Sequence, residues 1–291
     1  MWKRRRKFSL RRIGAARNAL VSGVLLNWPV LQDDGWSNMR KSVAYIAAHI
    51  RRVLVDGAAA PHTEEVQRFF KHEVKSRGWY TGELRKVAVR FRRTILEEYD
   101  LPYLLQVADR LFRGDVLEEK IFAVVMLQGI VGEFGKREFK LFESWLRRVS
   151  TWADHDALAH YLLGPMIAAD AQFLSRPLHW AKSKDRWHQR AAAVSLIHSA
   201  RQHKHFDHIQ RVTEILLARD DDMVQKGIGW LLREAAKANP EPIADYLMTI
   251  RDRAPRLVLR TACETLPEKT REKVLTRVRL HPAGARNVSL L

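Results

Sequence analysis

Apolar residues recur at spacings of three and four positions from about residue 40 to near the end of the chain, and this period constrains the fold more than any other feature. Such spacing places apolar side chains on one face of an α-helix, whereas a half-buried strand needs apolar and polar residues to alternate. Alternating β-branched stretches are almost absent, and Gly, Pro or Asp marks the short breaks. The sequence therefore predicts an all-α protein.

The predicted helices come in consecutive pairs. Corresponding pairs recur at about 35 to 45 residues, a spacing typical of stacked two-helix units of the HEAT or armadillo type. We predict a superhelical stack of antiparallel helix pairs with a concave basic surface, and an irregular helical bundle is the alternative. The expected helices span residues 63–77, 81–98, 102–113, 117–134, 138–149, 152–163, 166–173, 177–181, 187–200, 206–218, 223–238, 240–249, 255–265 and 268–277.

The charge balance indicates an anionic partner. The chain has 51 Lys and Arg against 33 Asp and Glu, a formal net charge of +18, which favours nucleic acid or an anionic membrane surface. Cys263 is the one cysteine, so an internal disulfide and a cysteine-only zinc site are excluded. This cysteine usage fits a reducing compartment, and we expect a cytoplasmic protein.

Residues 1–40 differ from the rest, because seven of the first twelve residues are Lys or Arg and a short apolar run follows. Arg17 and Asn18 interrupt that run, and it is too short for a transmembrane helix, so a secretory signal and a membrane span are the less favoured interpretations. A basic arm that adds phosphate affinity and an extension ahead of a start near Met39 both stay open. We expect this extension to precede one helical-repeat domain, residues 41–291.

The segment QKGIGWLLREAAKANP, residues 225–240, is typical of one amphipathic helix, but its polar face is unusual. Its apolar stripe consists of Ile228, Leu231, Leu232, Ala235 and Ala236. Trp230 falls on the opposite side, in line with Lys226, Arg233 and Lys237. An exposed indole among cations is typical of a surface that meets a polyanion with a flat or apolar part, and nucleic acid fits that description.

A second segment, STWADHDALAHYLL at residues 150–163, begins with a plausible capping box made by Thr151 and Asp154. A helix that starts at Trp152 would bury Ala157, Leu158, Tyr161 and Leu162. Trp152 and Asp156, four residues apart, would then share the opposite face. A tryptophan that packs on a neighbouring helix beside a solvated carboxylate is the structural alternative.

Together, TWADHDALA (151–159), WHQRAAAV (187–194) and QKGIGWLLREAAKANP (225–240) resemble the AlkD family of bacterial DNA alkylation-repair glycosylases. The likeness continues through residues 254–267 and, more weakly, back to about residue 63. It implies a right-handed superhelix of HEAT-like repeats that cups duplex DNA and removes positively charged N3- and N7-alkylpurines. It further implies that the base stays stacked rather than flipped, and that bulky adducts are accepted.

The resemblance also implies roles for particular residues. Two catalytic tryptophans fall on Trp152 and Trp230, the catalytic aspartate falls on Asp156, and the nearby arginine falls on Arg190, which would hold a phosphate or the carboxylate. Family members often carry an acid directly after the first tryptophan, where this chain has Ala153 and then Asp154. We expect His155 to face solvent, and an effect on substrate range is the alternative.

Other residues complete the expectations. Lys226, Arg233 and Lys237 would contact the DNA backbone, although Arg233 could equally pair with a carboxylate. His198, His203, His205 and His208 match no zinc spacing, so we expect a solvated basic loop, no metal and no cofactor. Residues 220–222 should cap a helix, and Trp145 and Trp187 should lie in the core. Trp79 and Tyr80 are core anchors or contacts to the DNA backbone.

Two classes of function compete. The first is a monomeric glycosylase acting on double-stranded DNA, without a membrane or an obligate protein partner. The second is a catalytically silent HEAT-like module that binds damaged or branched DNA. A third interpretation, a helical scaffold that binds an acidic protein, explains the positive charge but does not explain the exposed tryptophans.

Overall fold

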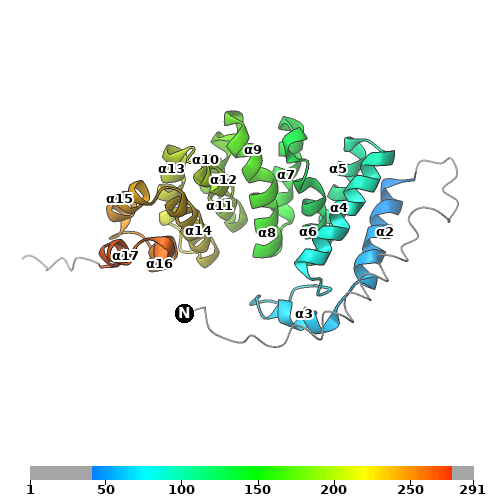
Figure 1. Ribbon diagram of the computed structural model, residues 1–291, viewed down its shortest axis with the longest axis horizontal. Coiled ribbons are helices and arrows are strands. Elements are labelled where there is room, and N and C mark those ends of the chain that lie inside the picture. Colours follow the sequence, from blue (N-terminus) through cyan, green and yellow to red (C-terminus); the bar gives the residue numbers. More distant parts are fainter. Residues whose placement is uncertain (1–40, 277–291) are drawn as a thin grey trace, which may run out of the picture. The chain divides into compact units, whose positions relative to one another are not determined.

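The computed structural model describes residues 41–276, and within this range every regular element is a helix (Figure 1). The all-α prediction is confirmed. The chain divides into two compact units between Phe122 and Ala123. The predicted basic extension, residues 1–40, lies outside the described residues. No helix between residues 41 and 276 is long and apolar enough to cross a membrane.

The first unit contains α2 (Val43–Asp56), α3 (Ala60–Gln67), α4 (Thr81–Glu98), α5 (Leu101–Phe112) and the start of α6 (Leu117–Gln128). Ser42 and Asp100 begin α2 and α5, because their side chains accept hydrogen bonds from the main-chain N–H of Tyr45 and Tyr103. Helix α5 packs against α2 and α4 through fully buried residues such as Ile50 and Leu104.

The predicted helix 63–77 is wrong beyond Gln67. The chain after α3 forms a loop instead, because hydroxyl and main-chain N–H groups of this segment donate hydrogen bonds to the buried carboxylate of Glu118. Glu118 accepts from Ser76 Oγ at 2.7 Å and from the main-chain N–H groups of Arg77 at 2.9 Å and Gly78 at 3.0 Å. Gly78 has φ of 70°, a left-handed conformation that a helix cannot contain.

The second unit is a succession of short helices. They are η1 (Val131–Glu133), α7 (Lys136–Trp145), η2 (Leu146–Arg148), α8 (Trp152–Leu158), η3 (Ala159–Leu163), α9 (Gly164–Ala169), η4 (Ala171–Phe173), α10 (Ser175–Ala181), α11 (Arg186–Val194), α12 (Ile197–Arg201), α13 (Phe206–Leu217), α14 (Asp222–Ala238), α15 (Pro240–Ile250), α16 (Arg256–Ala262), η5 (Cys263–Thr265) and α17 (Glu268–Leu275). The predicted boundaries agree to within a few residues, with two exceptions: the expected helix 187–200 breaks between α11 and α12, and the expected helix 117–134 ends at Gln128, where a turn leads into η1.

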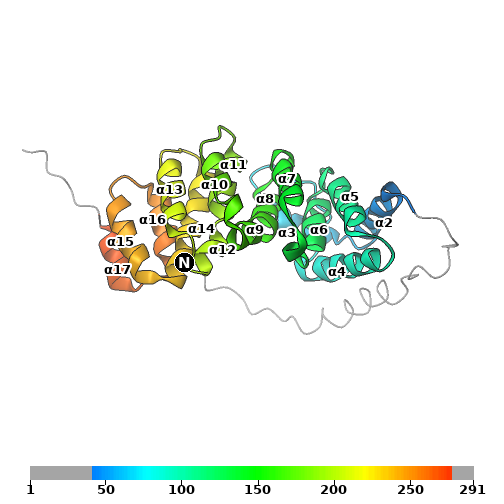
Figure 2. The same ribbon diagram turned by 90° about the horizontal axis from the view of Figure 1, so that it is seen from above.

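Within this unit the helices form two rows. Helix α11 packs between α8 and α14, and α14 packs in turn on α16, while α10 and α13 lie side by side behind them (Figures 1 and 2). This is the arrangement expected for stacked helix pairs. The row α8–α11–α14 carries every predicted catalytic residue.

Helix α14 shows why the predicted apolar stripe faces inward. Ile228, Leu231 and Leu232 are completely buried. Gly229 lets α16 approach closely, because a Cβ atom there would lie 2.7 Å from Thr261 Cβ. The predicted cap is confirmed, since the Asp221 carboxylate accepts from the N–H groups of Met223 and Val224.

Candidate functional site

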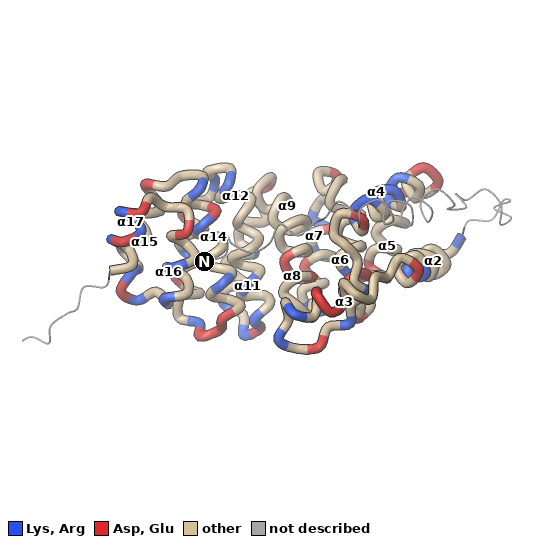
Figure 3. Tube along the Cα trace, turned by 60° about the horizontal axis from the view of Figure 1, so that its bottom comes forward, with Lys and Arg blue, Asp and Glu red and all other residues tan. Residues whose placement is uncertain are grey.

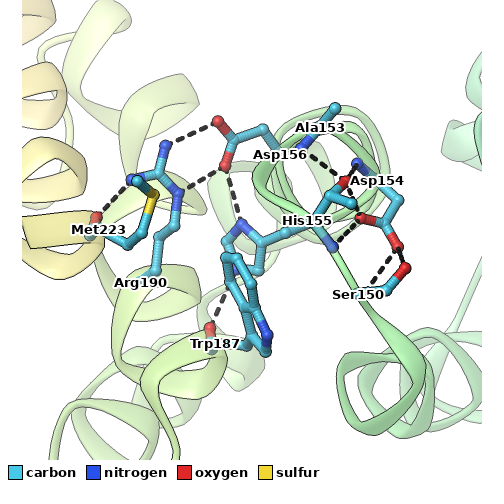
Figure 4. Close-up of polar contacts among 9 residues, drawn as sticks. Ser150, Ala153, Asp154, His155, Asp156, Trp187, Arg190 and Met223 are labelled. Carbon is cyan, nitrogen blue, oxygen red and sulfur yellow. Dashed lines mark hydrogen bonds and ion pairs between the residues drawn. The ribbon is translucent and has the colours of Figure 1, made fainter. Parts of the chain in front are cut away.

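The predicted capping box at the start of α8 is confirmed. Thr151 Oγ1 accepts from the N–H groups of Ala153 and Asp154, while Asp154 Oδ1 accepts from the Thr151 N–H at 2.7 Å. The second oxygen of Asp154 accepts from the Ser150 N–H at 2.9 Å. Asp154 is therefore occupied in fixing the first turn of α8, and Asp156 is the carboxylate left to face α11 (Figure 4).

Asp156 receives donors on both carboxylate oxygens. Arg190 of α11 donates from Nε to Oδ1 at 2.8 Å and from Nη2 to Oδ2 at 2.7 Å. His155 Nδ1 lies 2.8 Å from the same Oδ1. Figure 4 shows the carboxylate between the guanidinium and the imidazole. Of the two roles expected for Arg190, the structure shows the contact with the carboxylate.

These contacts keep Asp156 ionised. Burial by itself would raise the pKa of Asp156, but hydrogen bonds from His155 and Arg190 and the positive charge of Arg190 outweigh it and lower the pKa to about 2. The side chain keeps 16% of its surface exposed, so the charged group is held by protein on one side and accessible on the other.

The expectation that His155 faces solvent is wrong. His155 is completely buried, and its Nε2 lies 2.9 Å from the main-chain carbonyl oxygen of Trp187. The imidazole stacks on the Trp187 indole with ring centroids 5.3 Å apart. Trp187 is half-buried rather than a full core residue, and the guanidinium of the exposed Arg186 lies 5.7 Å from its indole. Trp145, by contrast, is fully buried as predicted.

Arg190 itself is fixed by α14. Its Nη1 donates to the main-chain carbonyl oxygen of Met223, and its side chain passes over Gly227, where a Cβ atom would lie 3.3 Å from Arg190 Cγ. The side chain of Arg190 is only 7% exposed. Three helices, α8, α11 and α14, therefore meet at one ion pair.

The helix that carries Asp156 continues into the π-helical turn η3, which shifts the register of the residues after Leu158. This shift explains why Tyr161, predicted in the core, is half-buried while His160 is buried. The His160 ring lies 5.4 Å from the ring of Trp230, which projects from α14 and is half-buried. Trp152, at the start of α8, is also half-buried.

His160 is held as a neutral ring. Arg201 Nη1 donates to its Nε2 at 3.4 Å, so the ring proton belongs on Nδ1, which is buried without a hydrogen-bond partner within residues 41–276. Burial lowers the pKa of His160 to about 4, and the nearby His198 and Arg201 act in the same direction. His198, predicted in a solvated loop, lies instead on α12 with its ring centroid 4.6 Å from that of His160.

The three cations predicted to contact DNA are all engaged in ion pairs. Lys226 Nζ lies 3.1 Å from Asp222, Arg233 Nη1 lies 2.7 Å from Glu264, and Lys237 Nζ lies 2.6 Å from Glu234. Basic and acidic positions lie interspersed along α14, α15 and α17 (Figure 3). The alternative role for Arg233, pairing with a carboxylate, is the one that the structure shows.

Two residues that touch the predicted site, His155 and His160, are absent from the set of site residues predicted from the sequence. His160 follows Asp156 by four positions, so the helical wheel contained a signal for it. The burial of His155 gave no such signal, because the carbonyl oxygen of Trp187 that its Nε2 meets lies 32 positions further along the chain.

Comparison with known proteins gives a family and a similar fold. A family model described as DNA alkylation repair enzyme matches residues 50–266. Among solved structures, the chain is similar to one described as a predicted DNA alkylation repair enzyme from Enterococcus faecalis. The TM-score is 0.64 at 17% sequence identity, over 72% of this chain and 96% of the other. No curated protein matches the chain significantly.

Proposed function

We propose that this chain, which belongs to the family of DNA alkylation repair enzymes, is a monofunctional DNA glycosylase. Its substrates would be cationic N3- and N7-alkylated purines in duplex DNA, and water would replace the base at the sugar. We infer further that it works as a monomer, without a cofactor, on chromosomal DNA in the cytoplasm.

The observation that carries this proposal is the ionised carboxylate of Asp156. It lies four residues after Trp152 on α8, and its pKa of about 2 keeps it negative at any physiological pH. So low a pKa also makes it a weak base. Asp156 is therefore suited to stabilise a cation electrostatically and to orient a water molecule. It is less suited to act as a general base that removes a proton from the nucleophile.

Release of an alkylated purine requires few catalytic groups besides this carboxylate. A purine alkylated at N3 or N7 already carries positive charge, so it leaves as a neutral base without a general acid. The sugar then develops oxocarbenium character, as in glycoside hydrolysis. A carboxylate near the sugar lowers the energy of that species, and the faces of Trp152 and Trp230 add favourable cation–π interactions.

The same arrangement fits an enzyme that leaves the base stacked. The proposed groups would act on the deoxyribose rather than enclose the base, so bulky alkyl adducts would be tolerated. Lys226 would contribute a contact to the DNA backbone. Its pair with Asp222 is exposed and contributes little stability, so the ammonium can exchange its partner for a phosphate at small cost.

The test is single-turnover release of 7-methylguanine from duplex DNA by the wild type and by Asp156→Asn. We expect release by the wild type and a loss of at least about 100-fold in the variant, with duplex binding retained. Asp207→Asn, at an exposed position of α13, is the matched control and should keep the wild-type rate.

Release by Asp156→Asn at the wild-type rate would contradict the role of Asp156. If the wild type binds duplex DNA tightly but releases no base, the glycosylase proposal fails and the chain is better described as a binding module for damaged or branched DNA.

A further inference from the structure

Both ring nitrogens of His155 meet an oxygen atom. Nδ1 lies 2.8 Å from Asp156 Oδ1, and Nε2 lies 2.9 Å from the carbonyl oxygen of Trp187. A main-chain carbonyl can only accept a hydrogen bond, and an ionised carboxylate can also only accept one. A neutral imidazole carries one N–H and would leave one of these short contacts without a proton.

We propose that His155 is a positioning residue for Asp156: its imidazolium donates from both nitrogens and so locks the carboxylate between α8 and α11. This inference rests on the proposed function, in which Asp156 is catalytic. In this role Nδ1 of His155 donates to Asp156 and Nε2 donates to the carbonyl oxygen of Trp187.

The charges around His155 are compatible with an imidazolium. Asp156 supplies the balancing negative charge at hydrogen-bond distance, and the Trp187 indole stacks on the ring, where it can stabilise a cation. Two positive groups oppose it, Arg190 on the far side of Asp156 and Arg186 against Trp187. Asp154, on the same helix, is engaged by the N–H groups of Ser150 and Thr151.

The mechanical consequence concerns rotation of the carboxylate. Arg190 binds both oxygens, but it reaches them from α11 through a long side chain. His155 is anchored to the backbone of Trp187 at the start of that same helix. The imidazole therefore ties the position of Asp156 to the main chain of α11, and a carboxylate held in this way needs no reorganisation when a cation develops beside it.

Two substitutions separate the two nitrogens. In His155→Asn the amide nitrogen takes the place of Nδ1, so the donor to Asp156 is kept and the bond to Trp187 is lost. In His155→Gln the amide nitrogen takes the place of Nε2, with the opposite result. We expect Gln, which loses the donor to Asp156, to lower the single-turnover rate roughly 10- to 100-fold, and Asn, which loses only the tie to α11, to lower it less, by about three- to tenfold, both at unchanged duplex affinity.

A spectroscopic readout tests the same role without any activity. In the full chain, ¹⁵N NMR should show a hydrogen-bonded proton on each ring nitrogen of His155. A ¹³C titration of the Asp156 carboxyl should give a higher pKa in His155→Gln than in His155→Asn. His208→Asn, a half-buried histidine on α13, is the control and should leave both readouts unchanged.

The outcomes distinguish the two proposals. A single proton on the His155 ring, or equal effects of Asn and Gln on the Asp156 titration, would overturn the positioning role. A wild type that releases no base while showing the expected NMR behaviour would remove the glycosylase and leave the role of His155 toward Asp156 intact.

Discussion

Two histidines flank Asp156 along the chain, and the protein places them in opposite electrostatic settings. His155 faces a carboxylate and a carbonyl oxygen, both of which favour protons on the ring. His160 faces Arg201 and His198, which favour the neutral ring. The cationic side of the site therefore lies behind the carboxylate, while the His160 ring beside Trp230 stays uncharged. A neutral neighbour suits an indole that is proposed to meet a developing cation.

The setting of His160 gives a prediction about stability in acid. The unfolded chain binds a proton to this side chain near the ordinary pKa of 6.5, whereas the folded chain resists protonation down to about 4. Between these values the unfolded state binds more protons, so the contribution of His160 to stability is fully present above pH 6.5 and declines as the pH falls to about 4. The decline integrates to about 3 kcal/mol.

Urea unfolding of the wild type and of His160→Gln at about pH 7 and about pH 4.5 measures this contribution. The free energy of unfolding should fall less in the variant over this interval. His198, whose pKa is also lowered, is present in both proteins, so the difference between the two losses belongs to His160 and its contact with His198. Identical losses in the two proteins would show that His160 is not held neutral.

At the scale of elements, local interactions were predictable and distant ones were not. The caps at Thr151 and Asp221 join residues two or three positions apart, so their sequence patterns identified helix starts correctly. The loop after α3 depends on Glu118, about 40 positions away, and the helical pattern alone gave no sign of it. The π-helical turn was likewise not predicted, and within it His160 is buried and Tyr161 half-buried.

The close contact between α14 and α16 gives a prediction about packing. In Gly229→Ala the new Cβ atom would meet Thr261 Cβ at 2.7 Å, a distance at which one helix must shift. Overpacking of this kind costs about 1 to 3 kcal/mol of stability. Because Trp230 is the next residue, we also expect the environment of its indole to change, as measured by fluorescence alongside thermal unfolding.

Gly82→Ala is the matched control for this prediction. It also lies in a helix, but a Cβ atom there meets nothing within 4 Å, so the substitution should leave stability unchanged or slightly raised. Adding Thr261→Gly to Gly229→Ala should restore part of the α14–α16 contact. An unchanged melting temperature in Gly229→Ala would mean that the two helices are not packed as closely as the structure indicates.

At the scale of the whole molecule, the net charge of +18 sets how the chain meets a polyanion. Binding to duplex DNA releases condensed counterions, so the logarithm of the affinity should fall linearly with the logarithm of the salt concentration. A scaffold for an acidic protein would be salt-dependent as well. An acidic polypeptide must therefore be tested directly as a competitor. If DNA is the partner, polyglutamate of matched charge should displace the chain from duplex DNA only weakly.

Substitutions of single lysines test whether the positive charge at the proposed site contacts DNA phosphates. Lys226→Gln should reduce the slope of log affinity against log salt by about one, because it removes one phosphate contact, and it should weaken binding equally for all sequences. Lys269→Gln, at an exposed position of α17, is the comparison, and its slope should match the wild type. Equal slopes for the wild type and Lys226→Gln would place the DNA backbone away from the face of α14 that carries Trp230. The proposal that Trp230 and Asp156 act together on one deoxyribose would then be wrong.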